Sequence, residues 1–375
     1  MANIYNLIYL ATFVLVIIYI FALLFIKIFK KMKFRNILFI ALLATFVSIG
    51  CEKNTDKPSD PPEQETPDPT PGKDDEEEWT GDYPKGVEVI EFNDELSNGK
   101  KCLGFAVTVD FKKNDKLKFT PYYTVPMKKP SEIYKEYGNR KDKACIVING
   151  GYFSGTKSIG LCISDGKLQA QGLRSMNWPN DNNYQKTVYP VRSAIGQMED
   201  GKFEITWVYQ PDPQFRKFYS YPSALDNNEK TKTFMETPPT AESHDAQLWS
   251  PVNALAAGPR LVEKGKNVAE TNYWKEVLDS GGTAGLSRQP RTAAGITADN
   301  KLILLVCDGR GNRGSAGFTL VELADKLISL GAVDALNFDG GGSSAIVGKD
   351  GAVLNSPSDK TERRIVTSIV ISERQ

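Results

Sequence analysis

The chain has 375 residues, of which 41% are hydrophobic and 25% are charged, and this composition is typical of a globular protein. Lysine plus arginine and aspartate plus glutamate number 46 each, so no excess of positive charge indicates a nucleic-acid partner, and we expect none. His244 is the only histidine, which excludes a zinc site made of several histidines of one chain. A Ser-His-Asp triad could use only this residue, and its polar surroundings favour a position on a surface loop.

The first 51 residues carry two apolar stretches. Residues 1–31 include an apolar run long enough to span a bilayer. Residues 32–51 then have a basic start, a short apolar core and small residues before Cys51, a pattern that resembles a bacterial lipoprotein signal. We therefore predict that residues 1–50 are a targeting segment and that the true start is Met32. The alternative is that residues 1–50 form one or two transmembrane helices.

The lipoprotein resemblance implies cleavage before Cys51 and lipidation of that cysteine. The protein would then be exported and held by its lipid on a bacterial membrane, with the outer membrane of the cell envelope as the expected location. Residues 51–84 are rich in proline, acidic and small polar residues, which cannot bury enough apolar surface to fold. We predict a disordered linker there, holding the folded part away from the membrane. Its acidic run, Asp74–Glu78, lacks the ligand spacing of a metal site.

The composition changes after residue 84, and we predict that residues 85–375 form one domain. Short β-rich runs alternate with turns at residues 86–92, 102–111, 144–153, 159–168, 203–209, 301–309, 335–342 and 365–372. Helical periodicity is clearest at 318–333, where leucines recur at three- and four-residue steps, Thr319 can cap the helix and Gly331 can end it. Residues 131–139 are a second helix candidate. The expected fold class is α+β, with a mixed β-sheet and a few packed helices.

Four cysteines follow the linker. Cys145 and Cys307 lie inside apolar runs, where cysteine usually packs as a small hydrophobic residue. No CxxC spacing indicates a metal or redox site. We therefore expect free, buried thiols at Cys102, Cys145, Cys162 and Cys307.

Several of the predicted strands run directly into polar and glycine residues, and polar groups at strand ends are where sheet scaffolds often hold their sites. The clearest case is "LNFDGGGSSA" at 336–345, where three glycines in a row need a reason because glycine costs backbone entropy on folding. The candidate site residues chosen on this basis are Asn149, Gly150, Arg291, Thr292, Asp308, Asn337, Asp339, Gly340, Gly341, Gly342, Ser343, Ser344, Glu362 and Arg363.

In series, these motifs resemble the phosphodiester glycosidase family. The matching stretches are "NGGYF", "AAGPRLVEKG", "RTAAGI", "LLVCDGR", "NFDGGGSSAIV" and "ERRIV", in the family's order over most of residues 145–375. Two positions depart from the family's pattern, because Phe338 stands where leucine is common and Arg364 stands where proline is common. The resemblance implies a hydrolase that cleaves the glycosidic bond of sugar-1-phosphate diesters, such as N-acetylglucosamine-1-phosphodiesters, at the bacterial cell envelope.

The residues suit that chemistry on physical grounds. A phosphate leaving group is already a stable anion, so charge stabilisation matters more than proton donation. Arg291 and Arg363 are the candidates for it, because the guanidinium fork pairs bidentately with phosphate. The glycines Gly340–Gly342 have no Cβ to block approach, and their successive N–H groups can form an anion nest, to which the hydroxyls of Ser343 and Ser344 can add donors.

A carboxylate should activate water or stabilise the oxocarbenium-like transition state, and Asp339 is the first choice and Asp308 the second. Asn149 and Asn337 are expected to hold sugar hydroxyls. No cofactor is required by the sequence, and we predict no metal site, although Ca²⁺ or Mg²⁺ beside a phosphate would be compatible with these carboxylates. The expected partners are a carbohydrate phosphodiester and a membrane.

Structural explanations compete at each position. Asp308 followed by glycine is typical of a hairpin turn, Arg291 could be an ion-pair partner, "NGGYF" could be a packed bulge, and Glu362 could simply pair with Arg363 at the surface. The alternatives for the whole protein are a non-catalytic surface lipoprotein that binds glycans or phosphoglycans, which the complete set of motif residues disfavours, and an envelope structural protein in which the glycines only make a turn.

Overall fold

The computed structural model describes residues 83–179, 186–214, 216–279 and 282–375. The predictions for residues 1–50, for Cys51 and for most of the linker fall outside these ranges. The described residues lie within one compact unit. None of their helices is long and apolar enough to cross a membrane.

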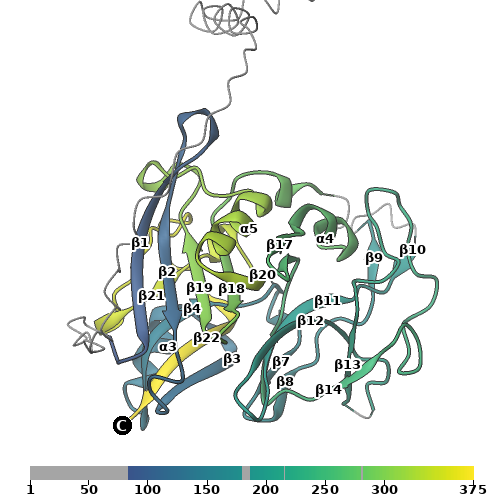
Figure 1. The fold of residues 1–375 in the computed structure, drawn as a ribbon, viewed down its shortest axis with the longest axis horizontal. Helices are drawn as coiled ribbons and strands as arrows, with labels where there is room; N and C mark the ends of the chain where they lie inside the picture. Colours follow the sequence, from purple (N-terminus) through teal and green to yellow (C-terminus); the bar gives the residue numbers. More distant parts are fainter. Residues whose placement is uncertain (1–82, 180–185, 215, 280–281) are drawn as a thin grey trace, which may run out of the picture. The chain divides into compact units, whose positions relative to one another are not determined.

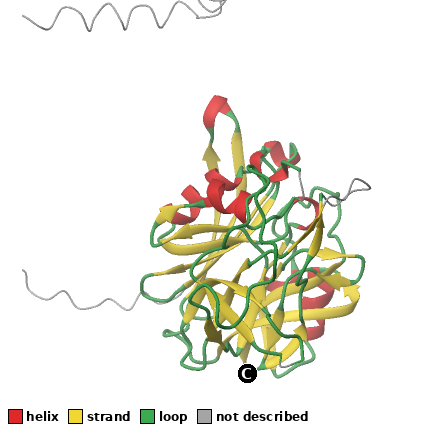
Figure 2. Cartoon of the chain, turned by 90° about the vertical axis from the view of Figure 1, so that its right-hand side faces the viewer, coloured by secondary structure: helices red, strands yellow, loops and turns green. Residues whose placement is uncertain are grey.

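Three antiparallel sheets make up most of the described chain (Figures 1 and 2). The first sheet has the order β1 (Val87–Glu95), β2 (Lys101–Val109), β19 (Leu302–Cys307), β18 (Arg291–Thr297), β20 (Ala332–Asn337), β16 (Arg260–Glu263) and β17 (Lys266–Asn267). The second has the order β14 (Gln247–Trp249), β13 (Phe218–Tyr221), β12 (Phe203–Tyr209), β11 (Arg192–Gln197), β15 (Asn253–Ala256), β7 (Cys162–Ser164) and β8 (Lys167–Ala170). The third has the order β21 (Ile346–Val347), β4 (Asp142–Asn149), β22 (Ile365–Arg374) and β3 (Leu117–Lys128).

Two short hairpins complete the strands, β5 (Phe153–Ser154) with β6 (Lys157–Ser158), and β9 (Met176–Trp178) with β10 (Lys186–Val188). The fold is therefore mainly β with few helices, which agrees in part with the expected α+β class. Every strand ladder among the described residues is antiparallel, so the mixed sheet that we expected is not found in them.

The described helices are α3 (Pro130–Tyr137), α4 (Ala269–Lys275) and α5 (Leu320–Ser329). Both helices that the sequence predicted, α3 and α5, are present. At α5 the hydroxyl of Thr319 accepts a hydrogen bond from the amide of Glu322, and Gly331 follows the helix with a left-handed φ of 92°. The leucines of α5 face the first sheet, which confirms that the leucine stripe belongs to the core.

The central strand β19 explains how the layers are joined. Its alternate residues Leu302, Leu304 and Val306 pack into the core shared with the second and third sheets. The residues between them, Ile303, Leu305 and Cys307, pack against α5 and its neighbours on the other face. Because both faces are covered, the strand is apolar throughout rather than alternating, and the sequence shows a continuous hydrophobic run. The four cysteines of the described ranges are buried and unpaired, as predicted.

Strand register brings the candidate residues to one edge. Arg291, the first residue of β18, lies opposite Cys307, so Asp308 follows at the end of β19. Ala293 lies opposite Asn337, so the glycine loop emerges from β20 on the other side of β18. In the third sheet Ser368 of β22 lies opposite Asn149, the last residue of β4. Strand ends from the first and third sheets therefore meet around the loop that begins at Asp339.

Candidate active site

Asp339 begins the loop that follows β20, and the pKa of its side chain is raised. Its amide donates to the carbonyl of Gly150 (3.1 Å), which attaches the loop to the end of β4. The side chain is half-buried, and burial raises the pKa of this carboxyl to about 6. The Ser343 hydroxyl, the Arg363 charge and the Gly340 amide each lower that pKa, but burial outweighs them. A carboxyl that titrates near neutral pH is suited to proton transfer.

The three glycines are explained by what packs against them. A Cβ on Gly340 would lie 2.7 Å from the carbonyl oxygen of Pro290. Gly341 has a φ of +60°, and its Cβ would lie 2.9 Å from the Arg310 guanidinium. A Cβ on Gly342 would overlap with the Arg363 guanidinium. Glycine is therefore required here because main chain and two arginine side chains press directly on the loop.

Three amides of the loop donate hydrogen bonds within the protein. The N–H of Gly341 donates to the carbonyl of Pro290 (2.9 Å), that of Ser343 to Gly340 (3.1 Å) and that of Ser344 to Gly341 (3.3 Å). Of the three glycine amides expected to form the nest, that of Gly341 is therefore used within the protein. Charge at this loop comes mainly from the two arginines that cover it.

Arg363 and Arg310 are both exposed and lie over the glycine loop. Arg363 pairs with Asp359 (Nη2 to Oδ2, 2.7 Å), and its Nη1 donates to the Ser343 hydroxyl (3.3 Å). Arg310 donates to the side chains of Gln289 (2.9 Å) and Ser358 (3.3 Å), and it has no ion pair with any described carboxylate. Arg310 stands two residues after Asp308 in the strand-end motif "LLVCDGR", which offered it as a polar group, but it was not chosen as a site residue.

Asn149 is buried, and its hydrogen bonds hold the loop in position. Its side-chain amide donates to the carbonyl of Asp339 (2.7 Å), and its Oδ1 accepts from the Thr292 hydroxyl (2.7 Å) and the Ala345 amide (3.2 Å). Asn149 and Thr292 are both 0% exposed. We expected these two residues to bind substrate, but their polar atoms are committed to positioning the loop.

Gly150, a third residue expected at the substrate, is required by packing. A Cβ there would lie 2.7 Å from the Thr367 hydroxyl, and its amide donates to the carbonyl of Thr367 (2.8 Å). Its own carbonyl is the one that anchors Asp339. The residue thus lets the end of β4 pass close to β22.

Asn337 and Tyr152 form a second polar group beside Asp339. The Asn337 amide donates to the Tyr152 hydroxyl (2.8 Å) and to the carbonyl of Gly258 (3.1 Å), which also accepts from that hydroxyl (2.9 Å). Asn337 is 1% exposed, so its expected contact with sugar hydroxyls is not available in this arrangement. Burial raises the pKa of the half-buried Tyr152, and the charge of Asp339 adds to that effect. Tyr152 therefore joins the candidate site; it stands in the motif "NGGYF" but was not chosen as a site residue from the sequence.

Arg291 is buried, and it serves neither of the roles considered for it. Its Nε donates to the carbonyl of Phe318 (3.0 Å), and its Nη2 contacts the carbonyls of Ala284, Gly285 and Ser287 at 3.1, 3.3 and 2.8 Å. No described carboxylate lies within ion-pair distance. Burial lowers the pKa of its guanidinium. The observed contacts fasten residues 284–287 to the start of β18.

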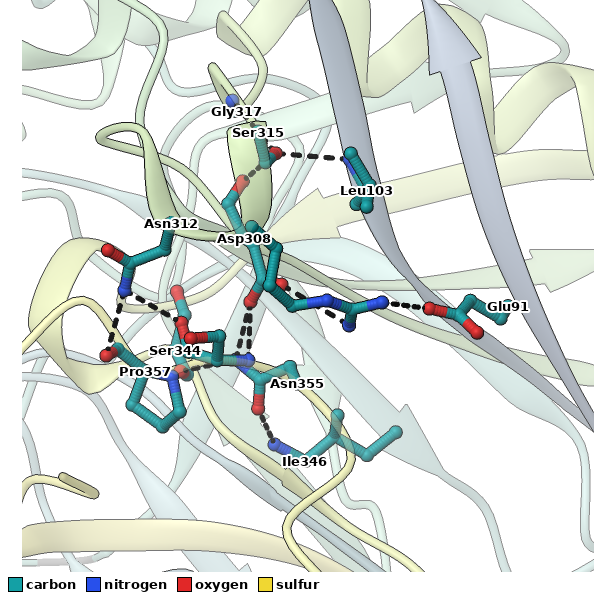
Figure 3. A network of polar contacts seen from close by, with 12 residues as sticks. Glu91, Leu103, Asp308, Asn312, Ser315, Gly317, Ser344, Ile346, Asn355 and Pro357 are labelled. Carbon is teal, nitrogen blue, oxygen red and sulfur yellow. Dashed lines mark hydrogen bonds and ion pairs between the residues drawn. The ribbon is translucent and has the colours of Figure 1, made fainter. Parts of the chain in front are cut away.

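Asp308 lies at the centre of a buried network (Figure 3). Its Oδ1 accepts from the Ser356 amide (2.8 Å) and from the Asn355 side chain (3.2 Å), which also donates to the carbonyl of Ser344 (3.1 Å). Arg313 lies 3.6 Å from its other oxygen. The side chain is 0% exposed, and burial raises its pKa. Asp308 differs from our catalytic expectation because it holds the segment that carries Ser358 and Asp359 and cannot contact substrate itself.

The last candidates also have structural partners. Glu362 accepts from the Ser131 amide (2.8 Å) at the start of α3 and does not pair with Arg363. Ser344 is 1% exposed and joins the Asp308 network through its carbonyl. Ser343, equally buried, is the serine whose hydroxyl acts on Asp339 and Arg363. No group of three or more acidic, cysteine or histidine side chains in the described ranges is arranged to hold a metal ion.

A family model described as "Phosphodiester glycosidase" matches residues 142–372, which is more than half of the chain and includes every residue of this site. The chain belongs to the phosphodiester glycosidase family. The chain covers less than a fifth of the length of the curated relatives that it matches. The chain is 32% identical over 121 residues to the SPbeta prophage-derived uncharacterized protein YomE of Bacillus subtilis, a match that covers 32% of this chain and 17% of that protein. It is 34% identical over 90 residues to the N-acetylglucosamine-1-phosphodiester alpha-N-acetylglucosaminidase of Bos taurus, covering 22% of this chain and 16% of that protein.

Among solved structures, the catalytic domain of the zebrafish N-acetylglucosamine-1-phosphodiester alpha-N-acetylglucosaminidase, auto-inhibited by its pro-peptide, has a similar fold. The TM-score is 0.53 at 20% identity, over 78% of this chain and 85% of that one. At this identity the likeness establishes the shared phosphodiester glycosidase fold.

Proposed function

We propose that this family member hydrolyses the glycosidic bond of sugar-1-phosphate diesters, with N-acetylglucosamine-1-phosphodiesters as the first substrate class. The observation that carries the proposal is Asp339, a half-buried carboxyl with a pKa near 6, directly beside a loop covered by Arg310 and Arg363. The bovine relative, whose name states this activity, supports the choice of substrate.

The arginines supply the charge that the leaving phosphate needs. Arg363 and Arg310 are exposed and project over the glycine loop, where their guanidinium groups can pair with phosphate oxygens. Arg310 has no described carboxylate to neutralise it. In the reaction the bond between C1 and the phosphate oxygen breaks, and the phosphate monoester leaves with the electron pair. Water forms the new bond to C1, and its displaced proton passes to the Asp339 carboxylate.

The remaining contacts of the loop hold it in position. Asn149 and Asp308 hold its two ends from inside the protein, and Ser343 connects Asp339 to Arg363. Such support fixes the distance between the base and the phosphate-binding arginines, which is what rate acceleration by preorganised groups requires.

We also propose that the protein works at the bacterial cell envelope, lipid-anchored through Cys51. The support is the signal-like pattern of residues 32–51 and the proline-rich acidic stretch that follows. Intact-mass measurement of protein from its native membrane tests this directly, since an unlipidated Cys51 would remove the anchor.

The activity is tested with purified full-length protein in detergent and a panel of sugar-1-phosphate diesters, N-acetylglucosamine-1-phosphate esters first, by following released reducing sugar. We expect turnover by the wild type and a loss of at least about 100-fold in Asp339→Asn. Asp200→Asn, in an exposed turn away from the site, is the matched control and should keep full activity. Diester binding without any product would instead support the non-catalytic glycan-binding function.

A further inference from the structure

Arg192, the first residue of β11, has a guanidinium that hydrogen bonds among the described residues satisfy only in part. Its Nη2 donates to the carbonyl of Val277 (3.0 Å) and contacts the sulfur of Met176 (3.4 Å). Its Nε is buried and has no hydrogen-bond partner among the described residues. No described carboxylate lies within ion-pair distance of it. A guanidinium stays charged at physiological pH, and withdrawing it from water without a partner is costly.

The nearby acid Glu276 does not satisfy this charge directly, because its oxygens are already occupied. One oxygen accepts from the amide (2.9 Å) and hydroxyl (3.0 Å) of Ser193. The other accepts from the Trp207 indole (2.9 Å) and the Arg260 amide (2.8 Å). Glu276 and Glu229 act on Arg192 only as charges at longer range.

A short backbone path leads from Arg192 to the Tyr152 hydroxyl. The carbonyl of its neighbour Ser193 accepts from the Ala257 amide (3.0 Å), and the next residue, Gly258, is the one whose carbonyl binds the Tyr152 hydroxyl. The charges of Asp339 and Arg192 both act on that hydroxyl. Tyr152 therefore lies within the electrostatic range of both Asp339 and Arg192, whereas Arg363 acts on Asp339 from the loop.

We propose that Arg192 is a second anion-binding position, and that the sugar released by this enzyme carries an oxyanion group of its own, a phosphate or a carboxylate, in addition to the diester phosphate. This inference rests on the proposed function, which places the diester phosphate at Arg310 and Arg363. The sugar then lies toward Tyr152, and a charged substituent on it meets Arg192. A neutral sugar would leave this guanidinium without an anionic partner, and a charge withdrawn from water without one is costly.

The test measures binding, so that it does not depend on turnover. Full-length Asp339→Asn protein is titrated calorimetrically with N-acetylglucosamine, N-acetylglucosamine 6-phosphate and glucuronic acid. We expect at least one acidic sugar to bind about 10- to 100-fold more tightly than N-acetylglucosamine. Comparing the two acidic sugars distinguishes a phosphate from a carboxylate. The preference should disappear in Arg192→Gln and return in part in Arg192→Lys, which restores charge without the planar fork.

Arg174→Gln is the matched control, because Arg174 is also half-buried, donates to the carbonyl of Gln210 (2.8 Å) and has no described ion pair. It should keep the acidic preference. Equal affinity for neutral and acidic sugars, or an acidic preference that survives Arg192→Gln, would overturn the inference. Thermal unfolding of each variant confirms that the fold is intact.

The two proposals fail separately. Hydrolysis of neutral diesters by the wild type, with no acidic preference in binding, removes the Arg192 site and leaves the proposed function. An Arg192-dependent acidic preference with no hydrolysis of any diester keeps the anion site and removes the proposed reaction.

Discussion

Replacing Gly342 by alanine tests the idea that the glycine loop exists to admit Arg363. The added Cβ would overlap with the guanidinium of Arg363 and the carboxylate of Asp359, which are the far ends of flexible, largely exposed side chains. These ends can move, so the substitution should displace the ion pair without disturbing the backbone. Gly340→Ala is the matched control in the same loop, because its Cβ would meet the main-chain carbonyl of Pro290 at 2.7 Å.

The expected losses of stability and of activity depend on which groups the added Cβ displaces. An exposed ion pair contributes up to about 1 kcal/mol, so Gly342→Ala should lower the free energy of unfolding by less than that. A charge-assisted hydrogen bond contributes about 1.5–3 kcal/mol, so displacing Arg363 from the phosphate should lower kcat/KM by about 10- to 100-fold. Gly340→Ala forces a shift of backbone, and overpacking of this kind costs about 1–3 kcal/mol of stability.

Urea unfolding and diester hydrolysis measured on both variants decide the matter. We expect Gly342→Ala to lose activity with little loss of stability, and Gly340→Ala to lose more stability. Wild-type kcat/KM in Gly342→Ala would refute the assignment of Arg363 to the phosphate. A larger loss of stability in Gly342→Ala than in Gly340→Ala would refute the packing argument itself.

Four further predictions concern three side chains, Asp339, Asp308 and Thr319. Because the pKa of Asp339 is about 6 and its carboxylate is the proposed base, kcat/KM should fall as pH drops through 6, and an acid limb that is absent would contradict this role. The same pKa shift also affects stability. The pKa of Asp339 is higher in the folded state than in the unfolded state, so the folded state binds more protons and its stability should decrease as pH rises from about 4 to 6. Asp339→Asn should remove this contribution in urea unfolding measured across that pH range. Asp308→Asn keeps an oxygen for the Ser356 amide and should retain most activity, whereas Asp308→Ala should lower both activity and stability; an inactive Asp308→Asn that remains folded would restore Asp308 as a direct participant. Thr319→Ala removes the cap of α5 and should cost about 1 kcal/mol in urea unfolding while leaving hydrolysis unchanged, so lost activity would show that α5 is coupled to the site.

Local patterns in the sequence were sufficient where a segment's structure depends on its own residues. The leucine spacing, Thr319 and Gly331 predicted α5, because the periodicity of a helix and its capping residues all lie within one short stretch of sequence. The run at 301–309 predicted β19, since a strand covered on both faces must be apolar throughout. The serial motifs also identified the phosphodiester glycosidase family.

Other features depended on partners that the sequence does not show. The short helix α4 has no side-chain cap at Val268 and little periodicity, so it is stabilised by packing against β16 and α5. Strand direction was likewise open, because a strand's residue pattern does not state which neighbour it will pair with or in which sense.

The sequence by itself determined that polar residues stand at the ends of buried strands and that the three glycines must accommodate a close approach. Only the tertiary structure decided which of those polar groups face outward. Asn149 reaches Asp339 across 190 residues, and Asp308 reaches Ser356 across 48, so their burial depends on contacts between distant segments. Arg310 and Tyr152 join the site for the same reason. A buried polar side chain must be hydrogen-bonded, and whether its partner is another part of the chain or a substrate is decided where the strand ends meet.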